Sequence, residues 1–160
     1  MTESKLKDLK KEYKKLQDKY NLPSFEQLNQ DFHIEKVAEV ETEILIREIR
    51  KFIADKLANY LRFIETLLNP MNAPMFVFSV MKSISVDDKG KLTKSYKRLA
   101  KNEVKLIKID LEFSEEKEAE FVKESYRIWQ EIKKDLSEIV EAIEQNWDNK
   151  FEVNGKGYLG

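Results

Sequence analysis

Residues that interrupt helices are scarce in this chain, and the scarcity limits what it can fold into. The 160 residues include only 4 Gly and 3 Pro. Because Gly and Pro mark most turns, so few of them leave long uninterrupted segments. Apolar residues recur along these segments at intervals of three and four, which is the period of an amphipathic helix. The sequence therefore predicts an all-α fold with long helices.

The length and the lack of cysteine define how such a fold is held together. A chain of 160 residues is long enough for one domain with its own apolar core. The absence of Cys excludes disulfides and thiolate metal sites. We expect a single helical-bundle domain over residues 1–149. Asn154–Gly155 is a hairpin signal, so residues 150–160 are expected to form a short irregular or hairpin-like tail.

Two long helices are expected to form the body of an elongated bundle. The first, over about residues 33–69, is apolar over a wide arc and is stopped by Asn69–Pro70. The second, over about 114–147, begins at the capping residue Ser114 and carries a nearly strict apolar seam. Shorter helices are predicted over 2–20, over 25–32 after a Ser24/Gln27 capping box, and over 91–108 after a turn at SVDDKG. A further short helix is expected within NAPMFVFSVMKSI, although the alternating apolar residues there fit a strand nearly as well.

The first helix carries a narrow apolar seam. Its residues are spaced alternately by three and four positions, which suits one partner helix in this chain or in a second copy. The seam is therefore a candidate interaction surface. It comprises Leu6, Leu9, Tyr13, Leu16 and Tyr20.

Charge is unevenly distributed along the second half of the chain. Residues 82–108 hold nine basic and three acidic side chains, whereas residues 110–148 hold thirteen acidic and five basic ones. Consecutive helices of opposite charge usually pack together and neutralise each other. The alternative is that the basic segment is a patch for an external partner such as nucleic acid.

Acidic residues are set into the apolar stretch VETEILIREIRKF. Heptad spacing puts Glu41 and Glu48 on one stripe that runs beside a packing seam. A semi-buried carboxylate needs a partner, so we expect Glu48 to pair with an arginine from another helix, either Arg98 or Arg127. The alternatives are an open cleft around Glu48 or a solvated helix edge. Glu43 and Arg47 are expected to form a local i,i+4 pair.

No pattern in the sequence predicts a catalytic, metal or cofactor site. The acids Asp135, Glu138, Glu141 and Glu144 follow steps of three, which spread them across about half a helix, so they cannot all meet one ion. The single histidine, His33, lacks the Glu-x-x-His spacing of carboxylate metal bundles and is expected at a helix junction. We therefore predict that the protein is not an enzyme and binds no cofactor.

Several runs in the chain are similar to an uncharacterised archaeal all-helical protein family. They are LPSFEQLNQDF, ILIREIRKF, LLNPMNAPMF and EKEAEF, and the resemblance that they carry covers most of the chain. None of these motifs is catalytic. The resemblance implies an all-helical fold and no particular activity.

These observations favour an interaction role for the protein. We expect a non-enzymatic helical protein–protein interaction or scaffold protein, which either binds a protein partner as an adaptor or self-associates through its apolar seams. The alternative is a nucleic-acid-associated accessory protein that uses residues 82–108. The charged N-terminus lacks a signal-peptide core, and the run MFVFSVM is too short to span a bilayer, so a cytoplasmic protein with no membrane partner is expected.

Overall fold

Helices form nearly all of the chain. The computed structural model describes the backbone of residues 2–71 and 73–159, and the side chains as far as Trp147. Within these residues there are six α-helices, one 3₁₀-helix and no strand, so the predicted all-α class is confirmed. The elements are α1 (Glu3–Tyr20), α2 (Phe25–Phe32), η1 (Ile34–Glu39), α3 (Leu45–Leu68), α4 (Met75–Lys82), α5 (Val86–Leu111) and α6 (Glu115–Leu159).

The chain divides into two compact units. The first unit comprises Met1–Asn59 and Lys101–Trp129, and the second comprises Tyr60–Ala100 and Gln130–Gly160. The helices α3, α5 and α6 each contribute one part to each unit. The expectation of one domain over residues 1–149 stays a prediction.

Helices α1 and α2 are joined by a short turn in the first unit. Asn21 adopts the left-handed conformation that ends α1. The predicted capping box begins α2, because Ser24 Oγ accepts from the Gln27 N–H at 3.1 Å and Gln27 Oε1 accepts from the Ser24 N–H at 2.9 Å. His33, in the left-handed conformation at φ 53°, ends α2 and is the predicted junction residue.

The apolar seam of α1 packs within its own chain. Leu9 and Tyr13 are buried, and α1 contacts both α2 and η1. The Tyr13 hydroxyl donates to the backbone oxygen of Pro23, and its ring meets the Phe25 ring edge-on at 5.8 Å. The central side chains of this seam are therefore already covered, and its use by a second copy stays a prediction.

The helix expected over residues 33–69 is interrupted, which corrects its predicted bounds. Residues 34–39 form the 3₁₀-helix η1, Val40 is extended, and α3 begins only at Leu45. The Thr42 hydroxyl accepts from the Ile44 N–H at 3.0 Å. Such a local bond gives the backbone an alternative to the helix. The apolar periodicity of the segment did not reveal that the bond to Thr42 competes with helix formation before Leu45.

Helix α5 extends beyond the predicted residues 91–108 at both ends. We expected SVDDKG to be a turn, but Ser85 Oγ accepts from the Asp88 N–H at 3.1 Å and α5 begins at Val86. Two aspartates in the first turn favour this start because they face the positive end of the helix. The helix then continues to Leu111, through residues expected to be an extended link.

The backbone of α6 continues to Leu159, where an irregular or hairpin-like tail was expected from residue 150. No Pro interrupts these residues, and extending an existing helix adds one hydrogen bond per residue fixed. The side chains of residues 148–160 lie outside the described part of the chain.

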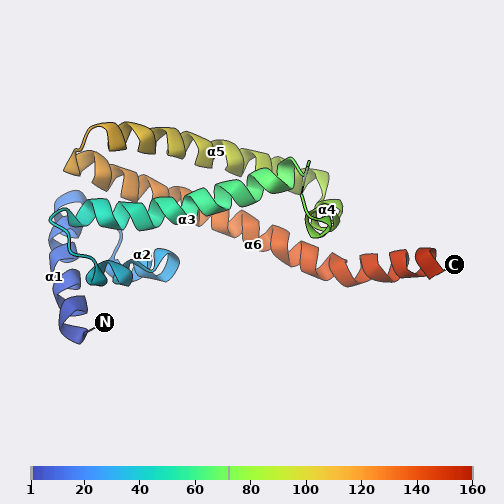
Figure 1. Ribbon diagram of the computed structural model, residues 1–160, viewed down its shortest axis with the longest axis horizontal. Helices are drawn as coiled ribbons and strands as arrows, with labels where there is room; N and C mark the ends of the chain where they lie inside the picture. The colour runs from blue at the N-terminus through green and yellow to red at the C-terminus, as the bar shows by residue number, and fades with distance from the viewer. Residues whose placement is uncertain (1, 72, 160) are drawn as a thin grey trace. The chain divides into compact units, whose positions relative to one another are not determined.

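Each unit has an apolar core of its own. In the first unit the start of α3, the end of α5 and the start of α6 lie side by side (Figure 1). Its buried side chains include Ile49, Ile53 and Val122, and those of the second unit include Ile64 and Leu92. No helix among the described residues is both long enough and apolar enough to cross a bilayer.

Candidate interaction surfaces

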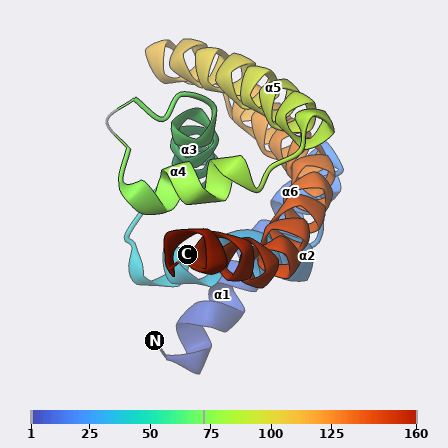
Figure 2. The same ribbon diagram turned by 90° about the vertical axis from the view of Figure 1, so that its right-hand side faces the viewer.

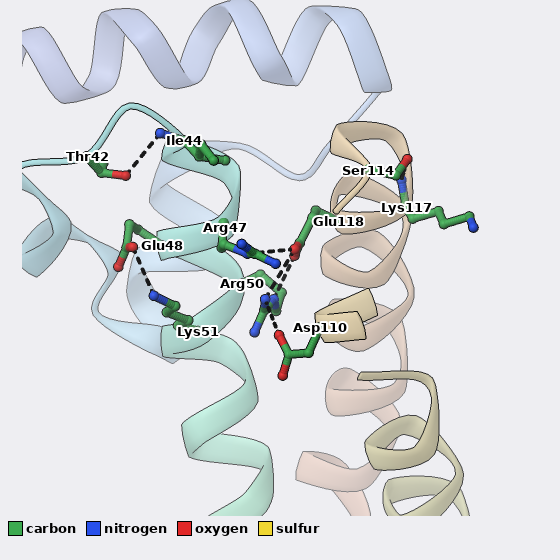
Figure 3. Close-up of polar contacts among 10 residues, drawn as sticks. All are labelled: Thr42, Ile44, Arg47, Glu48, Arg50, Lys51, Asp110, Ser114, Lys117 and Glu118. Atoms are coloured by element: carbon green, nitrogen blue, oxygen red, sulfur yellow. Dashed lines mark hydrogen bonds and ion pairs between the residues drawn. The ribbon is translucent and has the colours of Figure 1, made fainter. Parts of the chain in front are cut away.

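An ion cluster around the buried side chains of Arg50 and Glu118 joins three helices of the first unit. Arg50 Nε of α3 donates to Glu118 Oε2 of α6 at 2.6 Å, and Arg50 Nη2 lies 2.7 Å from Asp110 Oδ1 of α5 (Figure 3). Arg47 Nε approaches Glu118 Oε1 at 3.3 Å. Burial lowers the pKa of Arg50, but the hydrogen bond and the charge of Glu118 outweigh this, and the pKa is raised. These partners neutralise one another, so the cluster holds helices together.

The positions of these residues on their helices explain why they meet. Arg50 lies between Ile49 and Ile53 on the inner face of α3. Glu118 lies four residues before Val122, so it continues the apolar seam of α6 toward the start of the helix. Glu118 was missing from the seam predicted for this helix, although its spacing of four from Val122 was the signal that could have found it.

Glu48 does not have the partner that we predicted. Its Oε1 lies 3.1 Å from Lys51 Nζ, one turn along the same helix (Figure 3). The expected pairing with an arginine from another helix was wrong, because Glu118 is the acid that meets such arginines. Glu41 is exposed and precedes α3. Glu43 also lies before α3, and Arg47 pairs with Glu118, so the predicted local Glu43–Arg47 helix pair was wrong.

The two arginines proposed as partners for Glu48 hold acids of α6. Arg127 Nη2 lies 2.6 Å from Glu124 Oε1, three residues earlier on α6. In the second unit Arg98 Nη1 pairs with Glu131. Both are therefore ion-pair residues, as the sequence suggested, but with other partners.

The basic segment over residues 82–108 is partly neutralised by α6. In the second unit Arg98 pairs with Glu131, and the charged atoms of Lys91 and Glu138 lie 3.7 Å apart. In the first unit Lys105 and Lys108 line an open hollow of about 930 Å³. Lys19, Lys117 and Lys123 also line this hollow, with Glu116, Glu120 and Glu124. The described walls thus hold more basic than acidic side chains.

A small hydrogen-bonded group lies at the edge of this hollow. The Tyr20 hydroxyl donates to Glu115 Oε1 at 2.7 Å, and Lys19 Nζ lies 3.2 Å from the same oxygen. The bond from Tyr20, followed by that from Lys19, lowers the pKa of Glu115. The pKa of Lys19 is raised, first by a hydrogen bond with Tyr20 and then by the bond to Glu115. The group ties the end of α1 to the start of α6.

Helix α4 in the second unit leaves large apolar side chains exposed. It is a short helix between two loops (Figure 2). Met75 is 85% exposed, Phe76 67% and Phe78 44%, and Val80 is the buried residue of this helix. The Phe76 ring meets the Trp147 ring of α6 at a centroid distance of 5.7 Å. Met71, just before α4, is also exposed.

A second exposed apolar surface, besides that of α4, is a stripe near the end of α5 in the first unit. Val104 and Ile107 are each 57% exposed, and Leu111 is 82% exposed. Their spacing of three and four places all three on one side of the helix. The opposite side is packed, because Ile109 is buried and Asn102 Nδ2 donates to Ser125 Oγ of α6 at 3.1 Å.

No group of three or more His, Cys, Asp or Glu side chains that could hold a metal ion occurs in the part of the chain that the structure describes. Comparisons of the chain with models of protein families, with curated proteins and with solved structures find no match. The resemblance to an archaeal helical family therefore stays a prediction.

Proposed function

We propose that this chain is a non-enzymatic protein-interaction protein that associates with a second copy of itself through α4. The observation that carries the proposal is the exposure of Met75, Phe76 and Phe78 on one short helix. Exposed apolar side chains gathered into one patch mark protein interaction sites more often than the rest of a protein surface does.

The composition of α4 adds physical support. Its sequence MFVFSVMK is apolar on almost every side, and helices of this kind are normally buried. Here Val80 faces the interior, whereas Met75 and Phe78 do not. Methionine and aromatic residues are enriched at protein interfaces, because they provide large contact areas and adapt to a partner surface.

The charge of α4 favours a second copy as the occupant. Lys82, at the end of the helix, is its one charged residue. A symmetric dimer brings the same patch together from both chains, so a nearly uncharged patch creates little repulsion. We propose α4 for this role in place of the α1 seam, whose central residues Leu9 and Tyr13 are covered by the chain itself.

A nucleic-acid-associated role is the second candidate. It is supported by Lys101, Lys105 and Lys108, which are exposed and have no ion-pair partner among the described side chains. Binding of this kind would weaken steeply with salt, because it depends on neutralising phosphates. Titration of the protein with single-stranded and duplex oligonucleotides at low and moderate salt tests it.

The mass of the protein in solution tests the proposed function. We expect a concentration-dependent dimer that becomes monomeric when Met75 and Phe78 are replaced by glutamate. A monomer at every concentration would exclude self-association and leave the α4 surface for another protein.

A further inference from the structure

The exposed stripe on α5 has an unequal charge distribution on its two sides. Val104, Ile107 and Leu111 form the stripe, and Lys101, Lys105 and Lys108 follow it on the next side of the helix. From these residues we propose that the end of α5 is a docking surface for an acidic amphipathic helix of a partner protein. This surface lies in the first unit and does not involve α4.

The apolar part of the surface has the form of a helix-binding ridge. Val104 and Leu111 are seven residues apart, or about 10.5 Å along the helix axis. Ile107 lies between them on the same side. A partner helix is typically anchored by apolar residues at positions i, i+3 or i+4 and i+7, which match this spacing.

The lysines specify the charge of the partner. No ion pair to Lys101, Lys105 or Lys108 forms among the described residues. Lys105 and Lys108 also line the open hollow, together with Lys117 and Lys123 of α6. Carboxylates along one edge of a bound helix would lie against this basic row while the apolar edge covers the stripe. Charge complementarity of this kind determines which partner binds and speeds association.

The same charges disfavour two other occupants. If two copies paired α5 against α5 in antiparallel fashion, the lysine row of one copy would face that of the other, and like charges repel. A nucleic acid would use the lysines but would gain little from Val104, Ile107 and Leu111, which offer no aromatic ring for a base to stack on.

Binding of a defined probe to the full chain tests this inference. The probe is a synthetic helix of about 18 residues with leucine at the heptad a and d positions and glutamate on one flank. A second peptide carries lysine in place of each glutamate, and a single-stranded thymidine oligonucleotide is the third ligand. We expect saturable binding of the acidic peptide, weaker binding at higher salt, and little binding of the lysine peptide.

Substitutions on the chain separate the two parts of the surface. Leu111→Glu is expected to weaken the acidic peptide about tenfold, because it replaces an apolar contact by a like charge. A double change of Lys105→Glu and Lys108→Glu is expected to weaken it by a similar factor. Val140→Glu and Lys7→Glu are the matched controls, since both alter exposed residues outside this surface, and should leave binding unchanged.

Three results would overturn the inference. The first is that the acidic peptide shows no saturable binding, and the second is that the lysine peptide binds equally well. The third is that only the oligonucleotide binds, and that its binding is lost when the lysines are substituted but not in Leu111→Glu. Because Leu111 is highly exposed, its substitution should not unfold the chain, and the far-ultraviolet circular dichroism of each variant checks this.

Discussion

Arg50 of α3 and Glu118 of α6 are paired through two hydrogen bonds in the interior of the first unit. The donor atoms Nε and Nη2 lie 2.6 and 3.2 Å from the two carboxylate oxygens. The Glu118 side chain is fully buried, so the pair is shielded from water. Asp110 supplies a third bond to the same guanidinium. These bonds fix how α3, α5 and α6 meet.

Removing the carboxylate should destabilise the protein strongly. Glu118→Gln leaves the Arg50 guanidinium buried with less compensation, which we expect to cost about 3 kcal/mol of unfolding free energy. Urea denaturation followed by circular dichroism measures this loss. Glu12→Gln is the control, because it breaks an exposed pair with Lys15 and should cost less than about 1 kcal/mol. Equal losses for the two variants would contradict the importance of the buried pair.

Replacing both charges should be less harmful than removing one. The double variant Arg50→Met with Glu118→Leu removes the buried guanidinium together with its partner and keeps similar volume. We expect it to be more stable than Glu118→Gln in the same denaturation measurement. A double variant whose loss equals the sum of the losses of Arg50→Met alone and Glu118→Leu alone would show that the two residues act independently.

The capping box of α2 makes a separate prediction about stability. Ser24→Ala removes the oxygen that accepts from the Gln27 N–H, and we expect a loss of about 1 kcal/mol. Thr2→Ala is a matched control, because Thr2 precedes α1 but its side chain makes no capping hydrogen bond. Thermal denaturation of the two variants measures the difference. A larger effect of Thr2→Ala would contradict this account.

The bond between Tyr20 and Glu115 predicts a pH dependence. The lowered pKa of Glu115 means that folding favours its carboxylate form. Its contribution to stability is therefore present above the ordinary pKa near 4.5 and is lost as the pH falls through the lower folded-state pKa. Tyr20→Phe should raise the pKa of Glu115 toward 4.5, measured by carboxyl NMR titration. Tyr96→Phe should leave it unchanged, and an unaltered value in Tyr20→Phe would refute the assignment.

The helical fold could be predicted from the sequence because its information is local. The alternation of apolar residues by three and four, the scarcity of Gly and Pro, and the Ser24 capping box all act within a few residues. The break before Leu45 was missed because it depends on a single bond to Thr42, which does not change the apolar period. The early start of α5 at Val86 was missed for the same kind of reason, a cap by Ser85.

The surfaces and the ion cluster were harder to predict because they depend on which helix faces meet. Glu48 and Glu118 both lie beside apolar residues in the sequence, and tertiary packing buries Glu118 fully while Glu48 reaches Lys51. Periodicity likewise identified the apolar run of α4 but could not show that Met75 and Phe76 remain exposed. Exposure of that kind is a property of the folded chain.

Sedimentation equilibrium of the purified chain over a range of concentrations tests the central claim most directly. We predict a mass that rises to that of two chains, and a monomer for the variant with Met75→Glu and Phe78→Glu. Val140→Glu, an exposed apolar residue outside α4, should dimerise like the unaltered chain. A monomer at all concentrations, or a dimer that survives both α4 substitutions, would contradict self-association through α4.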